Sequence, residues 1–163
     1  MLRYTICFLL HDQQVLLLRR KYPPLQGLLN GVGGKLEPGE TPLDCILREV
    51  AEETGVHLTA ARFGGIVTWD GHSYEGKAGM YAYTANLPPD ADPAAIAGDT
   101  EEGALSWHPI TKVLNGLPEL VSNIPRFLAP MLAGAPPAEY HLHYDGDRLL
   151  GLTVLTLPGT TAD

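Results

Sequence analysis

The sequence predicts an α/β sandwich of one domain, because strand-like segments of mixed spacing occur together with two helix-like segments. The chain has 163 residues, which is long enough to bury one core. Hydrophobic residues make up 45% and charged residues 18%, as is ordinary for a globular protein. No internal repeat or low-complexity segment divides the sequence, so we expect a single domain over residues 1–163.

The N-terminal elements are predicted to be two strands and a loop. Residues 3–10 are rich in apolar and aromatic side chains, and residues 15–18 resume this pattern after a polar turn. The two segments therefore predict a hairpin. Residues 21–31 contain Pro23-Pro24 and Asn30-Gly31, which indicate a loop, and glycine remains frequent up to Gly39.

A helix is predicted directly after this glycine-rich segment. Thr41 fits the N-cap, Pro42 the first helical position and Gly55 the end, so the helix should run to about Thr54. Asp44 adds negative charge to the first turn. The predicted buried face has apolar spacings of three and four and consists of Leu43, Ile46, Leu47, Val50 and Thr54.

The second half of the chain predicts further strands, a second helix and a terminal hairpin. The strands cover residues 58–69, 78–85 and 104–107, with loops at 70–77 and 87–99. Residues 117–132 predict the helix, and Pro125 inside it indicates a kink or a late start near 122–124. The hairpin is predicted from residues 140–144 and 148–155 around Asp145-Gly146-Asp147.

The charge balance excludes two classes of partner. A net charge of −8 argues against a nucleic-acid polymer or an anionic membrane, because both require a basic surface. A small phosphorylated ligand stays compatible if metal ions lie between it and the protein's carboxylates. The apolar N-terminus lacks a small-residue cleavage site, so we interpret it as a strand and not as a signal peptide.

Cysteine usage points to a reducing compartment. Cys7 and Cys45 each lie in a predicted apolar element, where they resemble small buried hydrophobes. We therefore expect a cytoplasmic protein, either a monomer or a homodimer.

Three carboxylates on the first predicted helix are the strongest chemical signal. Glu49, Glu52 and Glu53 stand at i, i+3 and i+4, so they share one helix face. Such a pattern alone usually marks a solvated acidic face. Here a glycine-rich turn precedes it, Glu40 lies at the helix entrance, and Arg48 stands four residues before Glu52 and can orient it. Magnesium would offset the repulsion between these charges.

This segment resembles the Nudix box, G-x5-E-x7-R-E-U-x-E-E-x-G-U, where U is aliphatic. The matching residues are Gly34, Glu40, Arg48, Glu49, Val50, Glu52, Glu53, Gly55 and Val56. A motif with this many fixed positions is specific. The resemblance implies a Nudix fold, an α/β/α sandwich with a mixed β-sheet and two main helices, with the box at residues 34–56.

The resemblance also implies a metal-dependent pyrophosphohydrolase. Its ions, magnesium or alternatively manganese, would be held by Glu49, Glu52 and Glu53, assisted by the Gly34 carbonyl, Glu40 and Glu102. The implied catalytic set is Glu52, Glu53, Arg48 and Glu102. Glu102 is the candidate base outside the box, and Glu101 is its competitor. Water would attack one phosphorus of a polyphosphate while metal ions stabilise the leaving group.

Residues 29–35 resemble the same segment of the oxidised purine nucleoside triphosphate diphosphatases. By that resemblance Asn30 would read a purine edge and Lys35 would lie at the substrate, although Asn30 also fits an ordinary turn. Those relatives carry adjacent aspartates before the last helix, where this chain has Ser122-Asn123. Asn123 keeps a hydrogen-bonding group, while preference for an oxidised base is open. Trp69 and Met80 are candidates to stack on a base, and core packing is the alternative for both.

Several alternatives stay open from the sequence. Dinucleoside polyphosphates and nucleotide sugars are other possible substrates, and a non-catalytic nucleotide-binding regulator is a different class. An isomerase of isoprenoid diphosphates would need a cysteine facing the metal pocket. His141 and His143 alternate on the C-terminal strand, but no third ligand lies nearby in sequence, so we expect a surface strand there.

Overall fold

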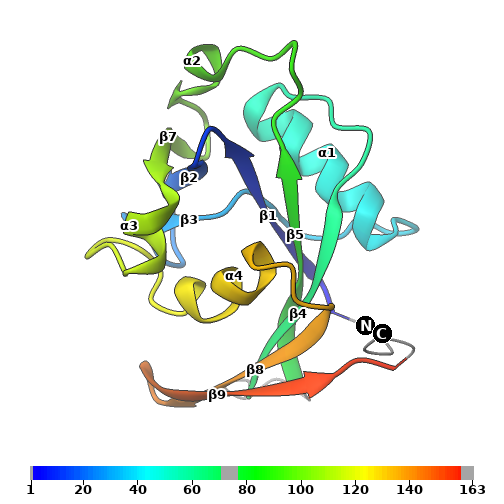
Figure 1. The fold of residues 1–163 in the computed structure, drawn as a ribbon, viewed down its shortest axis with the longest axis vertical. Coiled ribbons are helices and arrows are strands. Elements are labelled where there is room, and N and C mark those ends of the chain that lie inside the picture. Colours follow the sequence, from blue (N-terminus) through cyan, green and yellow to red (C-terminus); the bar gives the residue numbers. More distant parts are fainter. Residues whose placement is uncertain (1, 71–76, 159–163) are drawn as a thin grey trace.

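The computed structural model describes residues 2–70 and 77–158, and one mixed sheet organises them (Figure 1). The sheet has nine strands in the order β6-β7-β2-β1-β5-β4-β8-β9, with β3 paired to β2 off this path. The pairs β1–β5 and β4–β8 are parallel and the other strand pairs are antiparallel. The strands are β1 (Tyr4–His11), β2 (Gln14–Arg20), β3 (Leu29–Asn30), β4 (Arg62–Asp70), β5 (Lys77–Asn86), β6 (Gly98–Asp99), β7 (Gly103–Pro109), β8 (Ala138–Asp145) and β9 (Arg148–Thr156).

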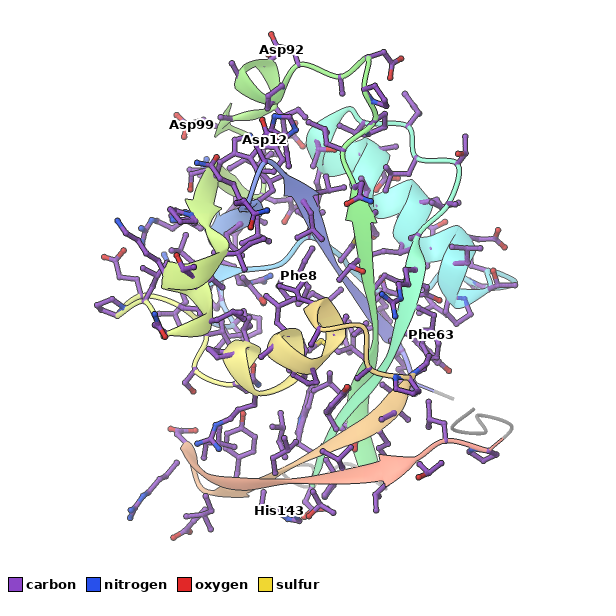
Figure 2. All side chains as sticks on the ribbon, viewed as in Figure 1. Phe8, Asp12, Phe63, Asp92, Asp99 and His143 are labelled. Carbon is purple, nitrogen blue, oxygen red and sulfur yellow. The ribbon has the colours of Figure 1, made fainter. Side chains whose placement is uncertain are left out.

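Helices pack on both faces of this sheet, which confirms the predicted α/β/α sandwich. They are α1 (Pro42–Thr54), α2 (Pro93–Ile96), α3 (Ile110–Leu114) and α4 (Ile124–Leu132). On one face, Phe8 of β1 packs against Phe127 of α4 with ring centroids 6.0 Å apart. On the other face, Ile46 of α1 packs in a second cluster that includes Phe63. Figure 2 shows Phe8 beside α4 and Phe63 on the side of α1.

Helix α1 forms as predicted because its ends are satisfied locally. The Thr41 hydroxyl accepts a hydrogen bond from the Asp44 amide at 3.1 Å, and the Asp44 carboxylate accepts one from the Thr41 amide at 3.2 Å. This reciprocal pair closes the N-terminus. Gly55 ends the helix with a φ of 77°, a left-handed conformation that suits glycine.

The buried face of α1 is rotated from the predicted one. Cys45, Ile46 and Val50 are buried, whereas Leu43 is 39% exposed, so its assignment to the core was wrong. Cys45, Glu49 and Glu53 follow one another at spacings of four, and this row lies next to Ile46 and Val50 on the helix. The helix therefore turns two of its box carboxylates inward, toward the sheet, and leaves Leu43 at the edge.

A glycine-containing segment separates β1 from β2. These strands pair with each other only at the hairpin end, where Leu10 lies opposite Val15. Further along β1, the backbone amides of Thr5 and Cys7 donate to the carbonyls of Gly34 and Val32 at 2.9 and 2.6 Å. Residues 32–34 thus occupy the position beside β1 that a neighbouring strand would take. The sheet opens there, and the start of the Nudix-box resemblance lies in this opening.

Other boundaries differ from the sequence prediction where tertiary pairing decides them. The strand predicted from residue 58 begins at Arg62, where pairing with β5 starts. The predicted loops at 21–31 and 87–99 contain the short elements β3, α2 and β6. Helix α4 begins at Ile124, which confirms the late start and places Pro125 in the first turn, where a missing amide costs nothing. The terminal hairpin is present as β8 and β9.

None of the helices in the described part of the chain is long and apolar enough to cross a membrane.

Candidate active site

The site is built where α1 faces the backbone of Gly33 and Gly34. A Cβ added to Gly34 would meet the carboxylate of Glu49, so the glycine lets this carboxylate lie directly against the loop. A Cβ added to Gly33 would lie 2.1 Å from the Thr5 carbonyl oxygen. The Gly33 backbone also lies close enough to Glu53 to lower the pKa of that carboxyl group against the stronger raising effect of burial. Two adjacent glycines therefore hold the loop between β1 and the carboxylates of α1.

Arg48 joins the acidic residues around it. Its Nε lies 2.9 Å from Oε1 of Glu40, and its Nη1 lies 2.9 Å from Glu49 and 3.2 Å from Glu52. Nη2 donates to the Lys35 carbonyl oxygen at 3.1 Å. Burial opposes its charge, but the hydrogen bonds to Glu40 and Glu49 raise the pKa of Arg48 above its ordinary value. The predicted pairing with Glu52 is present as one part of this larger network.

Glu53 carries the most strongly perturbed carboxyl group of the site. Burial, followed by the charges of Glu49 and Glu102, raises the pKa of Glu53 to about 8. Burial also raises the pKa of Glu49, against the lowering effect of the Arg48 hydrogen bond. Oε2 of Glu53 and Oε2 of Glu40 are both buried without a hydrogen-bond partner among the described residues. Such oxygens are costly to bury unless something donates to them or binds them.

A hard divalent cation fits this donor set. The carboxylates offer oxygens, which magnesium and manganese prefer, and two of these oxygens lack a hydrogen-bond partner in the part of the chain that the structure describes. A bound cation would stabilise Glu49 and Glu53 in their charged forms and offset the burial and the repulsion that raise their pKa values.

The remaining predicted metal and catalytic residues lie around this centre. Glu52 contacts Arg48, and its side chain is 58% exposed. Glu102 lies just before β7, where its carbonyl oxygen accepts a hydrogen bond from the Lys21 amide at 3.0 Å. After burial and the charge of Glu49, its charge is the next cause that raises the pKa of Glu53. The Gly34 carbonyl accepts a hydrogen bond from the Thr5 amide at 2.9 Å, and its role as a metal ligand stays a prediction.

The predicted substrate-binding residues form a second group. Trp69 of β4 and Met80 of β5 are half-buried and pack against the core cluster that contains α4. Asn123 lies just before α4, where its Nδ2 donates to the Tyr144 hydroxyl at 3.0 Å while its Oδ1 is buried without a partner. These residues lie on the α4 face of the sheet, whereas the acidic centre lies on the α1 face.

The other two predicted substrate-binding residues, Asn30 and Lys35, lie near residues 32–34, where the sheet opens between β1 and β2. Asn30 is on β3, and its Oδ1 accepts a hydrogen bond from the Gly31 amide at 2.9 Å. That hydrogen bond is the kind an asparagine makes when it stabilises a turn. Nδ2 of Asn30 donates to none of the residues that the structure describes. Lys35 has an exposed side chain at the end of the glycine segment.

The comparisons with known proteins agree with this geometry. The family model described as "NUDIX domain" matches residues 1–130. This chain belongs to the Nudix family. It is therefore a pyrophosphohydrolase that acts on nucleoside diphosphate-linked substrates, a class of enzyme that uses divalent metal ions.

Two curated Nudix relatives match at different extents. The chain is 33% identical over 116 residues to an uncharacterized Nudix hydrolase, YvcI, of Bacillus subtilis, covering 69% of each chain. It is 46% identical over 43 residues to an NAD-capped RNA hydrolase, NudC, of Vibrio parahaemolyticus, covering 26% of this chain and 16% of the relative.

Solved structures share the fold. A crystal structure of a mutator MutT protein from Bacillus halodurans superposes with a TM-score of 0.74 at 26% identity, covering 94% of this chain and 97% of that chain. The Nudix domain of Shewanella oneidensis NrtR in complex with ADP ribose has a TM-score of 0.58 at 24% identity, covering 82% and 86%. The second likeness concerns the fold alone.

The structure also reveals site residues that the sequence analysis missed. Thr5 is 4% exposed, and its hydroxyl donates to the Gly34 carbonyl at 3.3 Å while contacting the Cys45 thiol at 3.3 Å. A polar residue within an otherwise apolar strand was the available signal. The thiols of Cys7 and Cys45 are fully buried, and burial raises the pKa of both. The Cys45 thiol lies against the acidic centre, 3.8 Å from Nη2 of Arg48 and 4.0 Å from the Gly34 carbonyl oxygen, whereas the Cys7 thiol makes no hydrogen bond with these residues within the part of the chain that the structure describes. Both thiols lack exposed surface.

Glu53→Gln is expected to stabilise the metal-free protein in alkaline solution and to change little in acid. The folded-state pKa of about 8 exceeds the ordinary value of 4.5 for a glutamate, so the stability contributed by protonated Glu53 is complete below about 4.5. That stability is lost as the pH rises through about 8. Thermal unfolding with a chelator, from about pH 5 to about pH 9, measures the difference between the variant and the wild type.

Glu119→Gln is the matched control, since this exposed carboxylate pairs with Arg19 outside the site. Its unfolding temperature should follow the wild-type pH profile. Parallel profiles for Glu53→Gln and the wild type would contradict the raised pKa.

Proposed function

We propose that this pyrophosphohydrolase uses magnesium, or alternatively manganese, to hydrolyse a purine nucleoside triphosphate to the monophosphate and pyrophosphate, with oxidised purines among its substrates. The observation that carries the metal dependence is the pair of buried, unpartnered carboxylate oxygens of Glu40 and Glu53 beside Glu49. A cation would supply the partner that these oxygens lack among the described residues, and a cation can in turn bind a polyphosphate. The proposal treats residues 1–163 as one domain, in keeping with the pairing of β8 with β4 in the common sheet.

Each residue of the acidic centre has a proposed role. Glu49, Glu52 and Glu53 hold the cation, with Glu40, Glu102 and the Gly34 carbonyl as further donors. The bound cation would activate water and stabilise charge on the phosphate oxygens. Arg48 keeps Glu40, Glu49 and Glu52 oriented through the short contacts described above. Glu102 accepts the proton of the attacking water, a role supported by its electrostatic coupling to Glu53.

The base is proposed to bind on the α4 face and the phosphates at the acidic centre. Trp69 and Met80 supply half-buried apolar surface for stacking. Asn123 supplies a buried Oδ1 without a partner, which suits a donor on the base edge. Asn30 and Lys35 lie on either side of residues 32–34, which separate β1 from β2, so they would contact the substrate between the base and the phosphates.

The first experiment is a phosphate-release screen with magnesium, coupled to pyrophosphatase or phosphatase as each product requires. We expect purine triphosphates, standard or oxidised, to be hydrolysed faster than pyrimidine triphosphates, dinucleoside polyphosphates and nucleotide sugars.

Glu53→Gln should lower turnover by several orders of magnitude while the fold is retained, because it removes a cation ligand and relieves repulsion. A preference for nucleotide sugars or dinucleoside polyphosphates would overturn the triphosphate assignment alone.

Glu102→Gln is expected to lower kcat by about 100-fold with little change in KM, because a general base acts in the chemical step. Its matched control is Glu101→Gln, the adjacent carboxylate, which should stay close to wild type. Steady-state kinetics over a range of pH measures both variants. Equal losses in the two variants, or a loss only in Glu101→Gln, would move the base elsewhere.

Asn30→Ala should change discrimination between bases more than turnover. Losing one hydrogen bond to a purine edge is expected to raise KM for purine triphosphates by about fivefold to tenfold relative to pyrimidine triphosphates. The control is Asn115→Ala, since Asn115 is an exposed residue at the end of α3. A uniform loss for every nucleotide would contradict the base-reading role.

A further inference from the structure

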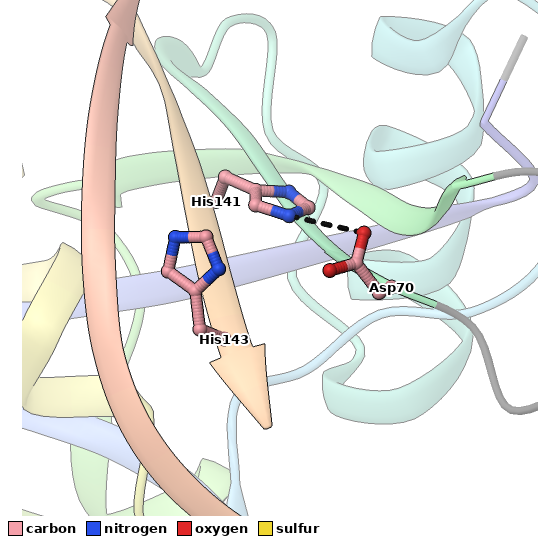
Figure 3. A group of neighbouring side chains, drawn as sticks. All are labelled: Asp70, His141 and His143. Atoms are coloured by element: carbon pink, nitrogen blue, oxygen red, sulfur yellow. Dashed lines mark ion pairs between the residues drawn. The ribbon is translucent and has the colours of Figure 1, made fainter. Parts of the chain in front are cut away.

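A cluster of two histidines and one aspartate lies outside the acidic centre. Asp70 of β4 and His141 and His143 of β8 each offer one ligand atom, and these three atoms all lie within 4.8 Å of one another (Figure 3). The parallel pairing of β4 with β8 explains why these three side chains lie close together. Thr68 lies opposite His141 and Trp69 opposite Leu142, so the next residue, Asp70, reaches the level of His143. The third ligand that the sequence did not show comes from another strand.

Hydrogen bonding fixes which nitrogen of His141 can bind a ligand. The Thr68 hydroxyl donates to Oε1 of Glu139 at 2.8 Å. The hydroxyl oxygen of Thr68 also lies 2.8 Å from Nδ1 of His141. A hydroxyl has only one proton, so Nδ1 must be the donor in the second contact. His141 therefore carries a proton on Nδ1. Its Nε2 faces Asp70, with 3.2 Å between Nε2 and Oδ1 (Figure 3).

His143 is held by a similar contact from the other side. Its Nε2 lies 2.7 Å from the hydroxyl of Thr153 on β9. Figure 3 shows the second ring nitrogen turned toward Asp70 and His141. Both imidazoles thus use one nitrogen for a threonine hydroxyl and present the other to a common point, as histidine ligands of metals commonly do.

The spacing of these groups suits a bound transition-metal ion. A neutral Nε2 and a carboxylate both present lone pairs, so their close approach requires a cation or a proton between them. Zinc–nitrogen and zinc–oxygen bonds are about 2.0–2.1 Å, which places two tetrahedral ligands about 3.3 Å apart. The observed separation of Nε2 and Oδ1 is 3.2 Å. We propose that Asp70, His141 and His143 form a binding site for a divalent transition-metal ion of the zinc class.

The chemistry of this site differs from that of the acidic centre. Imidazole nitrogens favour zinc-class ions, whereas the all-oxygen donors of α1 favour magnesium. The two sites share no residue. The side chain of His141 is 10% exposed while that of Asp70 is 76% exposed, so an ion can enter from solvent and retain a water ligand. Binding would tie the end of β4 to the C-terminal hairpin.

The test is metal titration of the full chain, purified without a polyhistidine tag and stripped of metal, in the Glu53→Gln background. We expect one equivalent of Co²⁺ to produce the visible absorption of a nitrogen-ligated ion of low coordination number. Zn²⁺ should displace it, and excess Mg²⁺ should not. Asp70→Asn and His143→Gln should each weaken Zn²⁺ binding by about 100-fold or more. Thr68→Val should weaken it by about tenfold, because the hydroxyl that holds the His141 proton on Nδ1 is lost.

His57→Gln is the matched control, because His57 is an exposed histidine outside the cluster, and its affinity should equal that of the parent. Asp70→Asn changes an exposed side chain, and circular dichroism checks that each variant is folded. Absence of the Co²⁺ absorption, or affinities unchanged by both Asp70→Asn and His143→Gln, would overturn the proposal. In that outcome a proton on Nε2 joins His141 to Asp70 as an ion pair. These readouts do not depend on the hydrolase substrate.

Discussion

The close approach of two glycine backbones to β1 and α1 is the constraint on which the rest of the site depends. The Gly33 backbone rests on the carbonyl of Thr5, and Gly34 rests on the carboxylate of Glu49, at distances where a Cβ has no room. Because residues 32–34 take hydrogen bonds from β1, they exclude β2 from that part of the sheet. The same contact thus opens the sheet, brings backbone groups to the carboxylates and determines how α1 must be rotated.

The rotation of α1 has an electrostatic consequence. An ordinary amphipathic helix would bury Leu43 and expose its acidic face, but here Glu49 and Glu53 lie beside the buried residues. Burial of charge is unfavourable, and it raises the pKa values of both groups. Arg48 offsets part of this cost through Glu40 and Glu49, while Glu53 has no comparable ion pair among the described residues. A bound cation would offset the rest of this cost and would thereby couple metal binding to stability.

The sequence predicted those features that local chemistry determines. Thr41, Asp44 and Gly55 determine the ends of α1 through their own backbone and side-chain bonds, so the helix was predictable from a short segment. The orientation of that helix was not, because it depends on the fit of Cys45 and Glu49 against Thr5 and Gly34, which lie far away in sequence. β3 was missed for a related reason. Two residues carry no periodicity, and their strand conformation comes from pairing with β2.

The same distinction explains why the histidine pair was visible in the sequence and its third partner was not. Alternation along one strand places His141 and His143 on one face, which is a local property. Asp70 joins them only through the parallel register of β4 and β8, and these two strands lie far apart in the sequence. Thr68 then lies opposite His141 by the same register, so one alignment supplies both the ligand and the hydroxyl that orients the imidazole. A parallel strand pair can therefore bring two imidazoles and a carboxylate together in the same fold whose helix α1 carries an all-carboxylate centre, and the two groups share no residue.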